Sequence, residues 1–187
     1  MGFFKALACY GIGAWVFDVV LRPMQMRDKA VAAAQRRGKP LLNVGAGTPG
    51  SSIRVSILGP TMWGDVNCDV AGSGSCTPDH VCHCDIHNIP YPDKYFGAVI
   101  ASHVLEHVDD PQRALREMHR VADEVFFVVP RWWGLHTWLQ TEHKWYITKD
   151  MRLYPLWQRP GALVNQQDVV PTLQSMSIPS YPEDVGR

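Results

Sequence analysis

The segment that most constrains the fold is residues 84–111, which reads CDIHNIPYPDKYFGAVIASHVLEHVDDP. Asp85 follows a run typical of a β-strand at residues 81–84, and a second apolar run leads into Ser102 and His103. A short apolar run bounded by turn residues is typical of a strand that is buried on both faces, as in a parallel sheet. Ligands of such sheets bind beyond the carboxyl ends of the strands. We therefore expect Asp85, Ser102 and His103 to face one crevice.

Further strands and helices alternate along the chain. Residues 28–37 predict a helix that ends at Gly38, and Asp110 followed by Pro111 is typical of the start of another helix. The remaining strands are expected at residues 41–44, 65–70 and 125–129. A short helix capped by Ser51 or Ser52 is expected after the first of these strands. This alternation of strands and helices predicts an α/β domain with a Rossmann-like, doubly wound, mostly parallel sheet.

Length and composition favour one folded domain. The chain has 187 residues, of which 46% are hydrophobic, and a chain of this size can bury a sizeable core. Its 18 basic and 18 acidic residues cancel, so no nucleic-acid partner is expected. We divide the chain into an apolar N-terminal helix at residues 1–27, an α/β domain at residues 28–164 and an irregular tail at residues 165–187.

The N-terminal segment is apolar, with Asp18 as the only charge between Lys5 and Arg22. It is shorter than the about 20 residues that span a bilayer, and no small-residue cleavage site of a signal peptide follows it. A helix packed on the domain, an anchor in or across a membrane, and a helix that binds a membrane protein or other partner all remain open. If the segment spans a membrane, the basic residues that follow place the domain in the cytoplasm. The expected location is the cytoplasm, with association to the cytoplasmic face of a membrane left open.

A glycine-rich turn follows the strand at residues 41–44. Gly45, Gly47 and Gly50 have the spacing G-x-G-x-x-G, and Asp69 comes about twenty residues later, as in a dinucleotide fingerprint. Glycine allows a tight turn and a close approach of the backbone to a ligand. A turn without a ligand remains an alternative. A phosphate-binding loop is not predicted, because no Lys-Ser/Thr pair follows the glycines.

Four sequence blocks together carry a family resemblance. They are LLNVGAGTPG, NCDVA, the segment of residues 84–111, and EVFFVVP. With them, the chain resembles the class I S-adenosylmethionine-dependent methyltransferases, and is closest to the small-molecule branch of the methyltransferase type 11 kind. The resemblance covers residues 41–130 and extends to EHKWYIT at residues 142–148. It implies the class I methyltransferase fold with shortened C-terminal strands, S-adenosylmethionine as cofactor, and methyl transfer to an unknown small or lipid-like acceptor.

The resemblance also implies roles for individual residues. The glycine turn would pass under the methionine part of the cofactor, and Asp69 would accept hydrogen bonds from the ribose hydroxyls, for which a carboxylate is a natural acceptor. Asp85 would bind the adenine amino group, with Ile86 against the ring. Ser102 and His103 would lie beside the sulfonium and its methyl group. The implied cofactor-binding residues are Asn43, Gly45, Ala46, Gly47, Asp69, Val70, Asp85, Ile86, Ser102 and His103.

Asn43 is the main departure from the family pattern. The family usually has an acidic residue there, which helps to hold the amino-acid end of the cofactor. Loss of that charge predicts weak binding, and Asn43→Asp is expected to tighten it about tenfold.

His103 is the expected catalytic residue. A histidine at a strand end, with a pKa near working pH, is a suitable general base. Glu106 and His107, in the turn that follows, are expected to make structural hydrogen bonds.

Cysteine and histidine are dense before the third strand, but no metal site is predicted. The cluster comprises Cys68, Cys76, His80, Cys82, His83, Cys84 and His87. Such residues can bind zinc, although the spacing is not that of a CxxC pair. We favour buried thiols and exposed histidines instead. The odd number of cysteines, five, indicates a reduced, intracellular chain.

Two alternative functions remain open. One is a catalytically inactive, methyltransferase-like accessory subunit of a membrane-associated assembly, because a fold does not fix a function. The other is an NAD(P)-binding Rossmann oxidoreductase. The second does not explain the LEHVDDP block.

Overall fold

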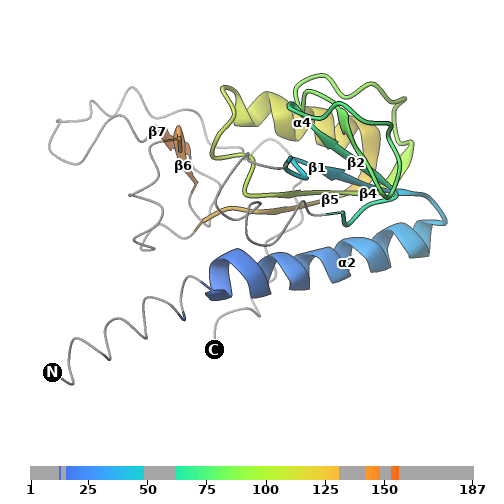
Figure 1. Cartoon of the computed structure of the whole chain (residues 1–187), viewed down its shortest axis with the longest axis horizontal. Helices are drawn as coiled ribbons and strands as arrows, with labels where there is room; N and C mark the ends of the chain where they lie inside the picture. The colour runs from blue at the N-terminus through green and yellow to red at the C-terminus, as the bar shows by residue number, and fades with distance from the viewer. Residues whose placement is uncertain (1–12, 14–15, 49–61, 131–141, 148–152, 156–187) are drawn as a thin grey trace, which may run out of the picture.

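Five parallel strands form the centre of the molecule in the order β3-β2-β1-β4-β5 (Figure 1). The computed structural model describes residues 13, 16–48, 62–130, 142–147 and 153–155. Its elements are η1 (Phe17–Leu21), α2 (Arg22–Arg37), β1 (Leu41–Val44), β2 (Val66–Asp69), β3 (Val81–His83), β4 (Phe96–Ser102), α4 (Pro111–Val121), β5 (Ala122–Val128), β6 (Trp145–Ile147) and β7 (Leu153–Pro155). The chain runs outward from β1 to β3, then returns to β4 beside β1. This is the doubly wound order, so the predicted fold class is confirmed.

Both faces of the sheet are covered. In Figure 1, α2 lies along one face and α4 along the other. All seven residues of β4 are buried. Ala98 and Ile100 pack with the alanines of α2, while Val99 and Ala101 belong to the core cluster that includes Leu115 of α4. The apolar run before Ser102, which predicted a strand buried on both faces, therefore does form one, and the strand covers residues Phe96–Ser102.

α2 begins six residues earlier than the predicted start at residue 28, at Arg22. It ends where expected, because Gly38 adopts the left-handed conformation, with φ of 61°, and donates its N–H to the carbonyl of Ala34. The helix lies very close to β4. A Cβ on Gly97 would stand 2.9 Å from the Cα of Ala34, so this contact requires glycine in the strand.

β5 starts directly after α4, at Ala122, whereas the apolar pattern predicted a start at residue 125. The pattern missed Asp123 and Glu124 because they are charged. Both are held by cations on or just after α2: Asp123 pairs with Lys39 at 2.8 Å, and Glu124 pairs with Arg36 at 3.3 Å. At the other end of α4, the side chain of Asp110 accepts from the N–H of Arg113, which confirms the predicted start of the helix.

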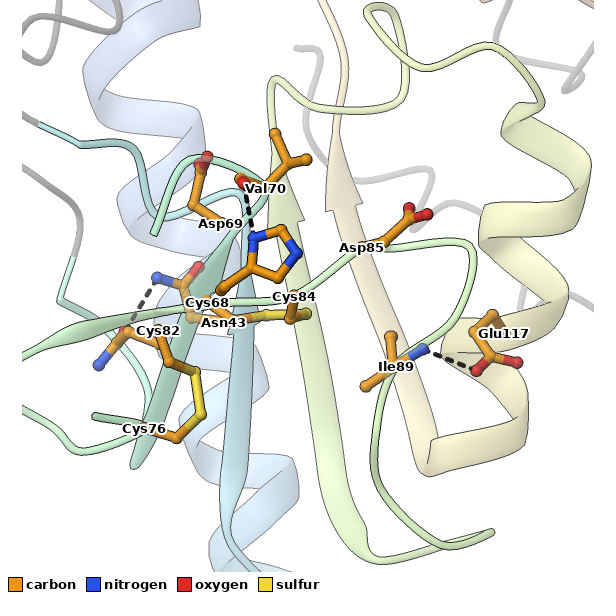
Figure 2. The surroundings of a disulfide bond; sticks show 12 residues. Asn43, Cys68, Asp69, Val70, Cys76, Cys82, Cys84, Asp85, Ile89 and Glu117 are labelled. Atoms are coloured by element: carbon orange, nitrogen blue, oxygen red, sulfur yellow. Dashed lines mark hydrogen bonds between the residues drawn. A yellow bond between two sulfur atoms is a disulfide. The ribbon is translucent and has the colours of Figure 1, made fainter. Parts of the chain in front are cut away.

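The loop between β3 and β4 is fastened to α4. The N–H of Ile89 donates to the carboxylate of Glu117 at 2.9 Å (Figure 2). The guanidinium of Arg120 donates to Glu117 and to the carbonyls of Ile89 and Tyr91. The hydrogen bond from Arg120 holds the pKa of Glu117 below its ordinary value. The loop that follows Asp85 is thus fixed at several points without a helix of its own.

Several predictions concern residues outside the described part. They include most of the N-terminal segment, Gly50, and the tail at residues 165–187. Among the described residues, no helix has the length and apolar character needed to cross a membrane. β6 and β7 form an antiparallel pair apart from the main sheet, where shortened C-terminal strands were expected.

Candidate functional site

The carboxyl ends of the central strands bring the predicted site residues to one edge. Asp69 is the last residue of β2 and pairs with His83, the last residue of β3. The N–H of Gly45 donates to the carbonyl of Cys68 at 2.8 Å, which places the glycine turn beside Asp69. Asp85 follows β3 by two residues, and Figure 2 shows its carboxylate at the same end of the sheet as that of Asp69. The carboxylates of Asp69 and Asp85 therefore lie at the same edge of the sheet as Gly45 (Figure 2).

The backbone of the glycine turn donates a hydrogen bond to the side chain of Asp69. Gly45 and Gly47 have φ of 72° and 80°, a conformation that favours glycine. The N–H of Gly47 donates to Oδ2 of Asp69 at 2.9 Å, and the N–H of Ala71 donates to Oδ1 at 3.0 Å. Each carboxylate oxygen has a second lone pair. Asp69 is therefore held in one orientation and can still accept two hydrogen bonds from a ligand.

Asp85 is held by the residue two places after it. Both the backbone N–H and Nδ1 of His87 lie within hydrogen-bond distance of Oδ1 of Asp85, at 2.9 and 2.8 Å. The backbone hydrogen bond, reinforced by the His87 side chain, keeps the pKa of Asp85 below its ordinary value. The side chain is about half exposed, so the ionised carboxylate is open to a ligand.

The apolar residues after these two carboxylates differ in exposure. Val70 is 69% exposed, which is high for a valine and leaves an apolar surface at the edge. Ile86 is buried in the core cluster. Ala46, in the glycine turn, is also buried. The predicted contacts of these three residues with the cofactor stay predictions.

Asn43 is buried within the sheet. Its Nδ2 donates to Oδ1 of Asn67 on β2 at 3.0 Å. Asn67 cannot easily turn over, because its own Nδ2 donates to the carbonyls of Gly64 and Pro78. The amide of Asn43 therefore holds β1 to β2. The predicted contact with the amino-acid end of the cofactor stays untested, but the expected gain from Asn43→Asp loses its basis.

We predict that Asn43→Asp destabilises the fold. The new carboxylate oxygen would face Oδ1 of Asn67, an acceptor, where a donor now lies. A buried polar group left without its partner costs about 1–3 kcal/mol. Chemical denaturation should show this loss of unfolding free energy. Asn43→Asp together with Asn67→Asp should be worse still, and a stability equal to that of the wild type would contradict the pairing.

Ser102 is the last residue of β4, and His103 follows it. His103 has φ of 56°, which is uncommon for a residue with a side chain and is often found at functional sites. Its N–H donates to the carbonyl of Val128, and its Nδ1 lies 3.2 Å from Oε1 of Glu106. Oγ of Ser102 is buried and has no hydrogen-bond partner among the described residues. A buried unpaired hydroxyl at the ligand edge of the sheet suits a site that is completed by a ligand.

The sequence predicted only structural hydrogen bonds for Glu106, but its carboxylate lies next to the predicted catalytic residue His103. Glu106 is 1% exposed, and burial alone would keep it neutral. Burial is the largest influence on its pKa, but the hydrogen bond from His103 and the positive charge that His103 and His107 carry when protonated together outweigh it and lower the pKa of Glu106. The carboxylate thereby orients the ring of His103, as the third member of a catalytic constellation does.

The cysteines contradict the expectation of free thiols. Cys68 forms a disulfide with Cys84, and Cys76 forms one with Cys82 (Figure 2). The first joins the residue before Asp69 to the residue before Asp85, so the two strand ends are covalently linked. With these four sulfurs paired, the cysteine-rich segment offers no thiolates for zinc. The sequence missed this because the pairing depends on how β2 lies beside β3, which brings the segment that carries Cys82 and Cys84 alongside Cys68.

The sheet order and the helices on both faces define a Rossmann-like, doubly wound α/β domain (Figure 1). Residues 65–124 match the family described as "Methyltransferase domain". This match agrees with the resemblance of the sequence to the class I S-adenosylmethionine-dependent methyltransferases. No curated protein matches the chain.

Two solved structures are similar to the chain. One is a SAM-dependent methyltransferase from Thermotoga maritima, described as a possible histamine N-methyltransferase, with 19% identity and a TM-score of 0.37 over 66% of this chain and 60% of that one. The other is assigned as an S-adenosyl-L-methionine-dependent methyltransferase from Methanococcus maripaludis, with 18% identity and a TM-score of 0.33 over 61% of this chain and 59% of that one. The chain thus matches about 60% of the length of each. Neither alternative function gains support from the comparisons.

Proposed function

We propose that the protein is an S-adenosylmethionine-dependent methyltransferase acting on a small or lipid-like acceptor. The observation that carries the proposal is the carboxylate of Asp69, which the N–H groups of Gly47 and Ala71 hold at the end of β2. A fixed carboxylate with two spare lone pairs suits the vicinal hydroxyls of a ribose. The family match over residues 65–124 supports the same function.

The residues at the edge suit the methionine part, the ribose and the adenine of this cofactor. Gly45 and Gly47 would carry the backbone past its methionine part without a side chain in the way. Asp69 would bind the ribose, and Asp85, ionised and half exposed, would accept from the adenine amine. The unpaired hydroxyl of Ser102 lies at the end of β4, where the reacting group is expected.

When bound, the cofactor supplies an electrophilic methyl group on its sulfonium. The protein then has to hold the acceptor in line with that methyl group and tolerate the moving positive charge. We assign the general-base role to His103. Its Nδ1 faces Oε1 of the buried Glu106 at 3.2 Å, and in the tautomer with hydrogen on Nδ1, Nε2 carries the lone pair that can take a proton from the acceptor.

The test is formation of S-adenosylhomocysteine from S-adenosylmethionine in the presence of an acceptor panel. The panel should contain phenols, amines, thiols and fatty acids, each assayed with and without detergent micelles. We expect one class to raise product formation above the background without acceptor, and His103→Ala to lower the rate by about 10²–10⁴-fold. Background rates with every class, in a protein that binds the cofactor, would favour the inactive accessory subunit.

We further propose that the N-terminal segment associates with a membrane or a membrane protein on its cytoplasmic side. The support is its sequence, in which Asp18 is the only charge between Lys5 and Arg22. An apolar helix flanked by basic residues binds anionic lipid surfaces by burial and charge together.

Removing residues 1–15 should therefore move the protein from the membrane fraction to the supernatant after centrifugation of a cell lysate. This deletion leaves η1 and α2 intact, including the buried Val19, so the α/β domain should keep its circular dichroism spectrum. Full-length protein that stays in the supernatant without detergent would contradict membrane association.

A further inference from the structure

A second cluster of polar side chains lies beyond β4, next to the strand pair β6–β7. It consists of Glu106, His107 and His143, whose potential ligand atoms all lie within 4.8 Å of one another. Glu106 and His143 are 1% and 7% exposed. The rings of His107 and His143 meet edge to face, with centroids 4.7 Å apart. Residues far apart in sequence thus present one carboxylate and two imidazoles to the same small space.

Three hydrogen bonds hold the backbone around the cluster in place. The N–H groups of Lys144 and Trp145 both donate to the carbonyl of Glu106, at 2.8 and 3.1 Å. Nε1 of Trp145 donates to the carbonyl of Val108 at 2.8 Å. These three bonds fix the start of β6 on the turn that carries Glu106 and His107. The side chains are therefore held near one another by the fold and not by their mutual attraction alone.

The protonation of His107 is set by its backbone partner. Its Nδ1 lies 3.2 Å from the carbonyl oxygen of Glu142. A carbonyl only accepts, so Nδ1 carries the hydrogen and Nε2 of the neutral ring carries the lone pair. Nε2 is the atom that faces Glu106, 4.0 Å from its Oε1. Metal-binding histidines characteristically donate their other ring N–H to a carbonyl or carboxylate in this way.

The carboxylate of Glu106 is only partly satisfied. Oε1 lies 3.2 Å from Nδ1 of His103, whereas Oε2 is buried and has no hydrogen-bond partner among the described residues. A buried carboxylate oxygen without a partner is costly. A cation bound by this oxygen would remove that cost, and the bond from Oε1 to His103 would orient the carboxylate as an outer-shell contact does.

We propose that Glu106, His107 and His143 form a binding site for a divalent transition-metal ion of the zinc kind. Two imidazoles and a carboxylate are the donor set of several zinc and iron sites. Magnesium and calcium prefer oxygen ligands, so the two imidazoles make these ions unsuitable for the site. Zinc bonds of about 2.0–2.2 Å place tetrahedral ligand atoms roughly 3.4 Å apart. The cluster reaches this spacing when side-chain rotations draw the ligand atoms inward by about 1 Å. Three protein ligands leave one position open for water or another ligand.

The experiment titrates the full-length, untagged protein with Zn²⁺, Co²⁺ and Mg²⁺ by calorimetry. We expect one equivalent of Zn²⁺ and of Co²⁺ to bind, and Mg²⁺ to give no heat. The Co²⁺ complex should show visible bands of nitrogen and oxygen ligation without a sulfur charge-transfer band. The measurement needs no S-adenosylmethionine, so its outcome is independent of methyl transfer.

Three variants test the assignment. His107→Ala changes a partly exposed side chain, and Glu106→Gln is isosteric, so both should fold. Because loss of an outer-shell partner already costs about 10–100-fold in affinity, we expect each to lose at least a hundredfold. His119→Ala, a partly buried histidine on α4 outside the cluster, should bind as the wild type does.

Three results would overturn the proposal: no Zn²⁺ binding by the wild type, unchanged binding by His107→Ala and Glu106→Gln, or a sulfur charge-transfer band with Co²⁺. The first would leave a hydrogen-bonded cluster that only fastens β6 to the turn. The others would move the metal to a different part of the chain.

Discussion

Asp69→Ala is expected to weaken S-adenosylmethionine binding by about tenfold to a thousandfold, since each hydrogen bond to a charged group contributes about 1.5–3 kcal/mol. The carboxylate lies at the end of β2, and two backbone N–H groups hold it in place. The alanine loses both the ligand contacts and this fixed orientation. Calorimetric titration of the two proteins measures the difference.

The controls separate binding from folding. Asp69→Asn keeps one acceptor oxygen and should lose less affinity than the alanine variant. Asp79→Ala removes an exposed carboxylate from the loop after β2 and should bind as the wild type does. Equal affinities for wild type and Asp69→Ala, with both proteins folded, would mean that Asp69 does not contact the ribose.

The second large effect is expected from Gly45→Ala. A non-glycine residue at φ of 72° costs about 1–3 kcal/mol. A Cβ there would also stand 2.1 Å from Cγ2 of Val104, far inside van der Waals contact. We expect the variant to lose cofactor binding and to unfold at clearly lower denaturant concentration. The cost of the positive φ and the cost of the clash with Val104 can be measured separately.

Gly38→Ala is the matched control. Gly38 has a similar φ of 61°, but a Cβ there meets nothing within 4 Å. Its substitution should therefore show the backbone cost alone. Adding Val104→Ala to Gly45→Ala should recover the part that is due to the clash. A Gly45→Ala protein as stable as Gly38→Ala would contradict the close contact with Val104.

The sequence predicted the fold because its strands are apolar and their ends are marked. The run before Ser102 indicated a strand buried on both faces, and the structure buries all of β4. Parallel strands share an edge for their carboxyl ends, so Asp69 and Asp85 could be placed together before any coordinates. The predicted order of strands and helices then left few other topologies.

The sequence failed where the partner is distant in the chain. Asn43 matched the position of a ligand-binding acid, but its side-chain amide donates a hydrogen bond to Asn67 on the neighbouring strand. The disulfides depend on strand register, which spacing alone does not give. Glu106 looked like an ordinary residue of a helical turn. Its proposed role depends on its burial and on its closeness to His143, which precedes β6 in the chain.

We propose that the edge formed by Gly45, Asp69 and Asp85 binds S-adenosylmethionine. A calorimetric titration of the full-length protein with S-adenosylmethionine and, separately, with S-adenosylhomocysteine tests this binding. Both share the adenosine and the amino-acid end, so we expect saturable heat with one site for each, and competition between them. A flat trace with both ligands, from a folded protein, would contradict the claim and leave a methyltransferase fold without its cofactor.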